Sequence, residues 1–255
     1  MRLALACAAL SLAAVASAAG PETLTFPSED GLAISVDLYL ASEDRSMPFL
    51  VLFHQAGWSR GEYREIAPRL NALGFHCMAV DQRSGGDVND VANETAKRAA
   101  AQGLGASYLD ALPDLRAALA YAREHFASGP LLAWGSSYSA ALLLRLAGDQ
   151  PGLVDGVLAF APGEYFRSLG KSGQWVREGA QHIAVPVFIT SARAERSQWQ
   201  AIYQAISSQK TAYLPETQGN HGSRALWRQF PDNSGYWSAV EAFLSPFLSS
   251  PGGQP

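Results

Sequence analysis

Apolar residues along the chain follow two patterns, and the alternation between these patterns predicts the fold. Continuous apolar runs are typical of strands buried on both faces of a sheet, whereas apolar residues three and four positions apart are typical of helices. The predicted strands are 49–53, 77–80, 130–134, 154–159, 185–189 and 211–214, and the predicted helices are 63–73, 108–126, 140–146, 195–206 and 234–247. Strands that alternate with helices imply an α/β fold, a mostly parallel sheet with helices on both faces.

The segment before these runs has a different pattern. Residues 23–27 and 32–40 alternate between apolar and polar around the turn Glu29-Asp30-Gly31, which predicts an antiparallel hairpin at the edge of the sheet. The whole set gives about eight strands in one α/β domain over residues 19–250, with a frayed tail at 251–255. Such sheets bind ligands beyond the carboxyl ends of their strands, so residues directly after strands are the candidates for function.

The N-terminus has the form of a secretory signal peptide. Arg2 is its only charged residue, an apolar run covers 3–15, and Ala16-Ser17-Ala18 is a small-x-small cleavage site. The run is too short to span a membrane as a mature helix. We therefore expect residues 1–18 to be removed and the protein to be periplasmic or secreted. Cys77 is then the one cysteine of the mature chain, which excludes an internal disulfide.

Charge and composition exclude several classes of partner. The chain has a formal net charge of −4 and no basic block, so neither nucleic acid nor an acidic membrane surface is expected as a partner. No pair of histidines has the spacing of a zinc-binding helix, and Gly103-x-Gly105 does not follow a predicted strand. We therefore expect no metal, no nucleotide and no other cofactor. Nothing in the sequence indicates an oligomeric state.

The sequence Gly-Ser-Ser-Tyr-Ser at 135–139 lies between the strand 130–134 and an apolar helix. A chain reversal this tight, with small residues two positions before and after a serine, is typical of a nucleophile elbow. The alternative is an ordinary strand-to-helix turn capped by serines. Ser136 and Ser139 are rival nucleophiles, but only Ser137 lies at the centre of the small-x-Ser-x-small frame.

A carboxylate and a histidine follow two later strands. Glu195 comes after strand 185–189, and His221 lies in a glycine-flanked loop after the last predicted strand. A serine hydroxyl needs an imidazole to accept its proton, and the imidazole needs a carboxylate to fix its tautomer. Ser137, Glu195 and His221 meet these needs. Two alternatives stay open, because Asp81 after an earlier strand could be the acid and Glu195 could be a first-turn helix residue.

The order of these three residues resembles that of the α/β-hydrolase superfamily, and within it the dienelactone-hydrolase-like and cutinase-like serine esterases. The resemblance runs from about residue 22 to 247 and includes a second motif, His-Gln-Ala-Gly-Trp at 54–58. It implies that the backbone N–H groups of Ala56 and Tyr138 form the oxyanion hole, and that His54 supports the loop.

The sequence departs from the relatives at three positions. Gln55 replaces a common glycine, Ser139 replaces the last glycine of the elbow, and Glu195 replaces the more frequent aspartate. A hydrolase fold that has lost its chemistry and serves as a binding protein is therefore an alternative interpretation.

The activity that the resemblance implies is that of a carboxylesterase acting on small acyl or aryl esters through an acyl-enzyme. The segment 162–184 is too short for a large helical lid, so an open site is expected. Trp58, Tyr165 and Phe166 are candidates for lining the substrate pocket. A polyester or an amide substrate is the alternative.

The predicted cleavage after Ala18 gives a simple test. When the gene is expressed with its own N-terminus in a bacterium, the exported protein should begin at Ala19. Fractionation followed by N-terminal sequencing measures this. Recovery of protein with an intact Met1 would contradict the prediction.

Overall fold

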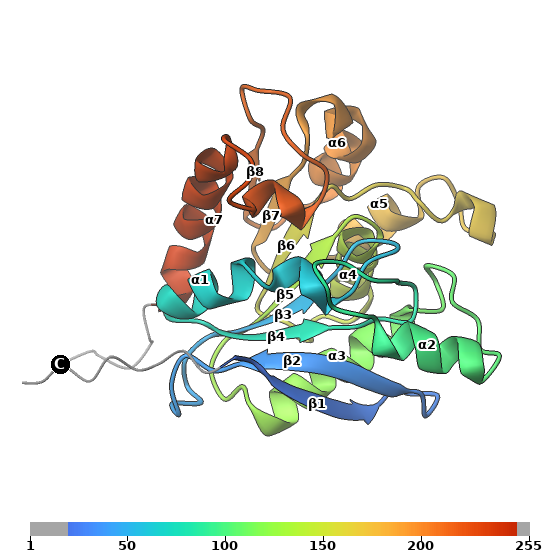
Figure 1. Ribbon diagram of the computed structural model, residues 1–255. Coiled ribbons are helices and arrows are strands. Elements are labelled where there is room, and N and C mark those ends of the chain that lie inside the picture. Colours follow the sequence, from blue (N-terminus) through green and yellow to red (C-terminus); the bar gives the residue numbers. More distant parts are fainter. Residues whose placement is uncertain (1–19, 249–255) are drawn as a thin grey trace, which may run out of the picture.

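The computed structural model describes residues 20–248, and its centre is one eight-stranded sheet (Figure 1). The strands are β1 (Glu22–Pro27), β2 (Ala33–Tyr39), β3 (Phe49–Phe53), β4 (His76–Val80), β5 (Leu131–Ser136), β6 (Gly156–Phe160), β7 (Val187–Thr190) and β8 (Lys210–Tyr213). They lie in the order β1-β2-β4-β3-β5-β6-β7-β8. Only the pairings β1 with β2 and β2 with β4 are antiparallel among these strands. The predicted mostly parallel sheet with an antiparallel edge hairpin is confirmed.

Helices cover both faces of the sheet. They are α1 (Ile66–Ala72), α2 (Glu94–Ala101), α3 (Leu112–His125), α4 (Tyr138–Asp149), α5 (Trp175–Ala180), α6 (Arg196–Ala205) and α7 (Asn233–Leu248). Side chains of α1 and α7 pack in one apolar cluster, and those of α3 to α6 pack in the other. Within residues 20–248, no helix is both long and apolar enough to cross a bilayer.

Several short elements lie outside the predicted set. Helix α2 buries only Thr95 and Ala99, and α5 has six residues, so neither carries a long apolar stripe. The predicted helix over 63–73 is divided, because a 3-10 turn, η1 (Arg60–Tyr63), precedes α1. Three further 3-10 turns are η2 (Arg167–Leu169), η3 (Arg193–Glu195) and η4 (Ser223–Leu226).

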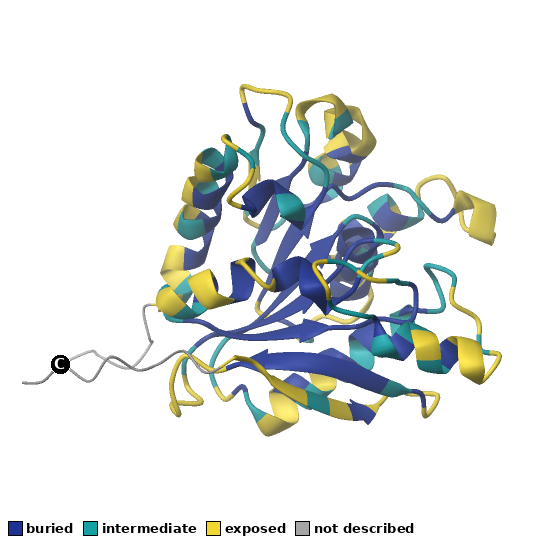
Figure 2. Cartoon of the chain, in the orientation of Figure 1, coloured by how far each residue is buried: buried dark blue, intermediate teal, exposed yellow. Residues whose placement is uncertain are grey.

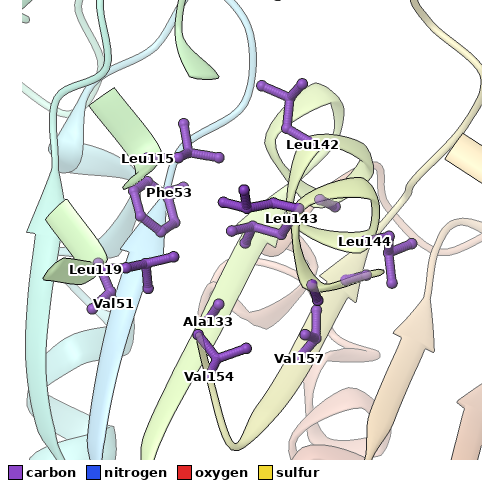
Figure 3. Packing of buried hydrophobic residues seen from close by; sticks show 14 of the residues in the cluster. Val51, Phe53, Leu115, Leu119, Ala133, Leu142, Leu143, Leu144, Val154 and Val157 are labelled. Atoms are coloured by element: carbon purple, nitrogen blue, oxygen red, sulfur yellow. The ribbon is translucent and has the colours of Figure 1, made fainter. Parts of the chain in front are cut away.

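The central strands are buried on both faces, which explains their continuous apolar runs. In β3, Val51 and Phe53 belong to the cluster under α3 and α4, whereas Leu50 and Leu52 belong to the cluster under α1 and α7. Figure 2 shows the inner strands dark along their whole length. Figure 3 shows Leu143 of α4 beside these strands. Full burial of one such side chain stabilises the fold by roughly 1.5–3 kcal/mol.

Helix α4 approaches β5 closely at Gly135. A Cβ atom at this position would lie 2.5 Å from the backbone nitrogen of Ala140 and 2.7 Å from its Cα. Real Cβ contacts of this length with backbone atoms do not occur, so the strand and the helix can meet here only at a glycine. This close approach fixes the single residue between them, Ser137.

Gly135→Ala should therefore lower the free energy of unfolding by at least about 1–3 kcal/mol, because the clash is with backbone that no rotamer change can relieve. Gly173→Ala is the control, since a Cβ there meets open space and should change stability by less than about 0.5 kcal/mol. Urea denaturation of both variants measures the difference. Equal stability of the two variants would contradict this account.

Candidate active site

Ser137 is the one residue between β5 and α4, and its backbone is strained. Its φ of 60° and ψ of −119° lie in a region that side-chain-bearing residues rarely adopt, so the surrounding structure must hold it there. Two hydrogen bonds do so: Ser137 N donates to Phe160 O at 2.7 Å, and Ala141 N donates to Ser137 O at 3.2 Å. This is the conformation that a nucleophile elbow requires.

Ser139, at the position of the last glycine in the G-x-S-x-G motif, connects the elbow to the end of β3. Its Oγ donates to His54 O at 2.5 Å and accepts from Gln82 Nε2 at 2.6 Å. The Gln82 amide also donates to His54 O and accepts from His54 N, at 3.1 and 3.2 Å. The serine hydroxyl therefore has a structural use at this site, in a buried network that joins two loops.

Glu195 and His221 are in direct contact. His221 Nδ1 lies 2.6 Å from Glu195 Oε1, and the other carboxylate oxygen accepts from Ala192 N at 3.1 Å. Glu195 is the last residue of the 3-10 turn η3. It is therefore a first-turn residue, as the alternative interpretation expected, and it also contacts His221. An imidazole that donates from Nδ1 to a carboxylate has its Nε2 available as a proton acceptor.

Asp81, the rival acid, has other partners. Its carboxylate accepts from Arg60 N at 2.8 Å, from Arg60 Nη1 at 2.6 Å and from Glu94 N at 2.9 Å. Burial raises the pKa of Asp81 to about 6, and the Arg60 guanidinium opposes that rise. Asp81 thus anchors η1 and the start of α2, and the carboxylate next to His221 is that of Glu195.

His54 holds the loop that contains Ala56. Burial lowers the pKa of His54 to about 4, so the ring is neutral near pH 7. Because its Nε2 accepts from Gln82 N at 3.1 Å, Nδ1 carries the hydrogen and donates to Gln55 O at 2.8 Å. In a trans peptide the C=O and the next N–H point in opposite directions. The bond to Gln55 O therefore sets the direction of the Ala56 N–H.

Sequence reasoning missed Glu62, a fully buried carboxylate beside this loop. Glu62 Oε2 accepts from Gln55 N at 2.8 Å, and Oε1 accepts from Ser136 Oγ at 2.7 Å. Burial raises the pKa of Glu62 to about 7, and these hydrogen bonds and His221 oppose the rise. No pattern in the sequence marks it, because a lone glutamate in a predicted helix start is usually exposed.

The three candidate pocket residues have different surroundings. Trp58 is half-buried and stacks on Trp227, with ring centroids 5.3 Å apart. Tyr165 is half-buried, and its hydroxyl donates to Ala161 O at 2.7 Å.

Burial raises the pKa of Tyr165, and the nearby Glu195 carboxylate raises it further. Tyr165 is connected to the elbow through Ala161, which follows Phe160, the residue whose carbonyl accepts the Ser137 N–H. Phe166, in contrast, is fully buried against Trp175, so its assignment to the pocket is wrong and its ring belongs to the core.

Tyr138 is also buried, and its ring stacks on Tyr108 with centroids 4.6 Å apart. Its hydroxyl donates to Ser84 O at 3.2 Å and accepts from Gln82 Nε2 at 3.0 Å. The side chain thus fixes the start of α4, where the N–H groups of the first turn lack intrahelical acceptors. In the part of the chain that the structure describes, no three His, Cys, Asp or Glu side chains are grouped so as to hold a metal ion.

One family model and many solved structures are similar to this chain. A family model described as serine aminopeptidase, S33, matches residues 45–166, a region that contains Ser137 but neither Glu195 nor His221. No curated protein sequence matches the chain.

Many solved structures do resemble it. Dienelactone hydrolase from Anabaena variabilis has a TM-score of 0.66 at 12% identity, over 91% of this chain and 100% of that one. A Pyrococcus furiosus esterase, Pf2001, has a TM-score of 0.65 at 16% identity, over 90% and 93% of the two chains. Brefeldin A esterase, a bacterial homologue of human hormone-sensitive lipase, has a TM-score of 0.65 at 15% identity, over 95% and 80%. At identities this low, the structural similarity establishes a common fold and nothing more.

Proposed function

This chain has the α/β-hydrolase fold, and from that premise we propose that it is a serine hydrolase that cleaves carboxylic esters. The observation that carries the proposal is the 2.6 Å contact between Glu195 Oε1 and His221 Nδ1, two residues that follow different strands of the sheet. The strained backbone of Ser137 supports it. In this proposal Ser137 is the nucleophile, His221 the base and Glu195 the acid that orients the base.

The chemistry proceeds in two halves. Ser137 Oγ attacks the ester carbonyl carbon as its proton passes to His221 Nε2, and a tetrahedral oxyanion forms. The C–O bond to the alcohol then breaks, and the imidazolium returns the proton to the leaving oxygen. Water repeats the sequence on the acyl-enzyme, releases the acid and restores the Ser137 hydroxyl. Glu195 stabilises the imidazolium in both halves.

The N–H groups of Ala56 and Tyr138 are the proposed oxyanion donors. Tyr138 is the first residue of α4, where N–H groups are free and the helix dipole favours a negative charge. Ala56 N is bonded to no acceptor within residues 20–248. Both donors are fixed before substrate binds, which is what makes an oxyanion hole effective.

Tyr165 and Trp58 are the proposed contacts for the acyl or aryl part of the substrate. Tyr165 follows β6, whose end pairs with the end of β5 just before Ser137, and the side chains of Tyr165 and Trp58 are both partly exposed. Aromatic surface of this kind favours a small apolar or aromatic ester. The segment 162–184 contains only η2 and the short helix α5, consistent with a site that has no large lid.

Hydrolysis of an amide is a second candidate function, favoured by the match to the serine aminopeptidase family model over residues 45–166. The two candidates need the same nucleophile but leaving groups of different basicity. Nitrophenyl esters of increasing acyl length, measured beside aminoacyl nitroanilides, distinguish them. Export to the periplasm or medium is part of the proposal and rests on the sequence of residues 1–18, which lie outside the described residues.

A fluorophosphonate probe tests the proposal directly. It should label the wild-type protein with one-to-one stoichiometry and leave folded Ser137→Ala unlabelled, because only an activated serine reacts with it. Intact-protein mass spectrometry measures the labelling. If folded wild-type protein is not labelled, the fold serves as a binding protein instead.

Glu195→Gln should fold normally and lose about 10⁴-fold in kcat, since an amide at this position favours the wrong histidine tautomer. Asp81→Asn is the matched control, because Asp81 also accepts backbone N–H groups but does not contact His221. Its kcat should stay within a fewfold of wild type. Steady-state kinetics on a nitrophenyl ester measure both variants. A loss below about tenfold in Glu195→Gln, or a larger loss in Asp81→Asn, would transfer the acid role.

A further inference from the structure

Glu62 lies at the junction of the three loops that carry the proposed catalytic groups. Its Oε2 accepts from the N–H of Gln55, the residue before the oxyanion donor Ala56, at 2.8 Å. Its Oε1 accepts from Ser136 Oγ, next to the nucleophile, at 2.7 Å. Ser136 Oγ in turn accepts from the N–H of Ser223, two residues after His221, at 2.9 Å. One carboxylate is thus connected to all three loops.

The histidine loop packs directly on this network. A Cβ at Gly222 would lie 2.4 Å from Ser136 Oγ and 2.9 Å from Gln55 Oε1. Gly222 also has a φ of 70°, so the loop both needs a glycine here and comes closer to the network than any side chain would allow. The position of His221 is therefore coupled to Ser136 and, through it, to Glu62.

The backbone around Glu62 is itself fixed. Trp227 Nε1 donates to Glu62 O at 2.9 Å, and Tyr63 Oη donates to Phe53 O at 2.7 Å. Trp134 Nε1 donates to Ser223 Oγ at 2.8 Å. These bonds hold η1 against the end of β3 and hold the histidine loop against β5. The Glu62 carboxylate is therefore fixed in place and cannot move with a loop that shifts.

Gln55 is restrained on both sides. Glu62 holds its N–H, and His54 Nδ1 holds its C=O at 2.8 Å. Fixing both peptide groups that flank one residue fixes its φ and ψ. The direction of the Ala56 N–H is therefore set although position 55 is not a glycine.

The carboxylate is poorly placed to add stability. It is fully buried, and no Lys, Arg or His nitrogen within residues 20–248 comes within salt-bridge distance of it. A buried charge without a counter-ion costs free energy that hydrogen bonds only partly offset. Its raised pKa, caused by burial, is the sign of that cost. A role in holding the groups of the site in position would account for a glutamate at position 62.

We propose that Glu62 is a positioning residue that holds the oxyanion loop, the nucleophile and the histidine loop in mutual register. The inference rests on the proposed serine hydrolase function. Glu62 touches no reacting atom and acts through Gln55 N–H and Ser136 Oγ. Its contribution therefore belongs to transition-state binding rather than to ground-state substrate binding.

The test compares Glu62→Ala, Glu62→Gln and Ser136→Ala with wild type. Glu62→Ala frees the Gln55 N–H and should lower kcat on a nitrophenyl ester about 10²-fold, the effect of a misplaced oxyanion donor, with KM changed less than about threefold. Glu62→Gln keeps an acceptor for Gln55 N–H and should recover most of the loss. Ser136→Ala removes the hydroxyl that connects Glu62 to the nucleophile strand and to the histidine loop but keeps the bond from Gln55 N–H to Glu62, so its kcat should lie between those of the two Glu62 variants.

Affinity for a boronic acid inhibitor separates positioning from stability. Phenylboronic acid forms a tetrahedral adduct that needs the oxyanion hole, so its Ki should rise by the factor by which kcat/KM falls. Asp114→Asn is the matched control: Asp114 is a buried carboxylate of α3 that accepts the Arg83 N–H and has no hydrogen-bond partner in the three loops. This variant should lower the melting temperature with kcat and Ki near wild type.

The outcomes are distinct. A wild-type protein that neither hydrolyses the esters nor reacts with a fluorophosphonate overturns the proposed serine hydrolase function and with it this inference. An active wild type whose Glu62→Ala and Ser136→Ala variants keep kcat and Ki overturns the inference alone. Loss of folding in both variants also overturns it, because Glu62 would then serve stability.

Discussion

The hydrogen bond from Ser139 Oγ to His54 O, 2.5 Å long, connects the two halves of the site. One end belongs to the first turn of α4 and the other to the end of β3, which are neighbours only because β3 and β5 pair in parallel. Gln82, from the end of β4, accepts from and donates to the His54 backbone and also donates to Ser139. A parallel sheet brings three strand ends together, and this buried network fixes the loops that leave them.

The strain at Ser137 depends on that arrangement. A residue with φ of 60° and ψ of −119° persists only where its neighbours leave no alternative. Gly135 allows α4 to approach β5, Ser139 fixes the first helical turn to β3, and Phe160 O accepts the Ser137 N–H. Serine at position 139 contributes a side-chain hydrogen bond that a glycine could not make.

Sequence patterns predicted the sheet and most helices because both rest on burial. The runs at 49–53 and 130–134 are apolar at every position since both faces of β3 and β5 are covered. The alanine-rich helix α2 escaped prediction, because it buries little. Order along the chain and small residues at turns identified Ser137, Glu195 and His221 as candidates, and the structure brings Glu195 and His221 into contact.

Other parts of the site have no sequence signature. The sequence alone could not distinguish Phe166 from a pocket residue. Whether a side chain after a strand end is exposed depends on the fold of the following loop, and Phe166 is buried. Glu62 was equally hidden, since its contacts depend on Gln55 and Ser136 meeting at one point in space.

A carboxylate in this position also explains how the loop tolerates Gln55. Glycine is needed in an oxyanion loop when the backbone must adopt a conformation closed to other residues. Gln55 is absent from the residues with positive φ, which include Gly57 two positions later, so the loop turns at Gly57 and not at position 55. With that conformation open to a side chain, rigidity can come from hydrogen bonds to both flanking peptides. Glu62 and His54 supply them, so a glycine is not required at position 55.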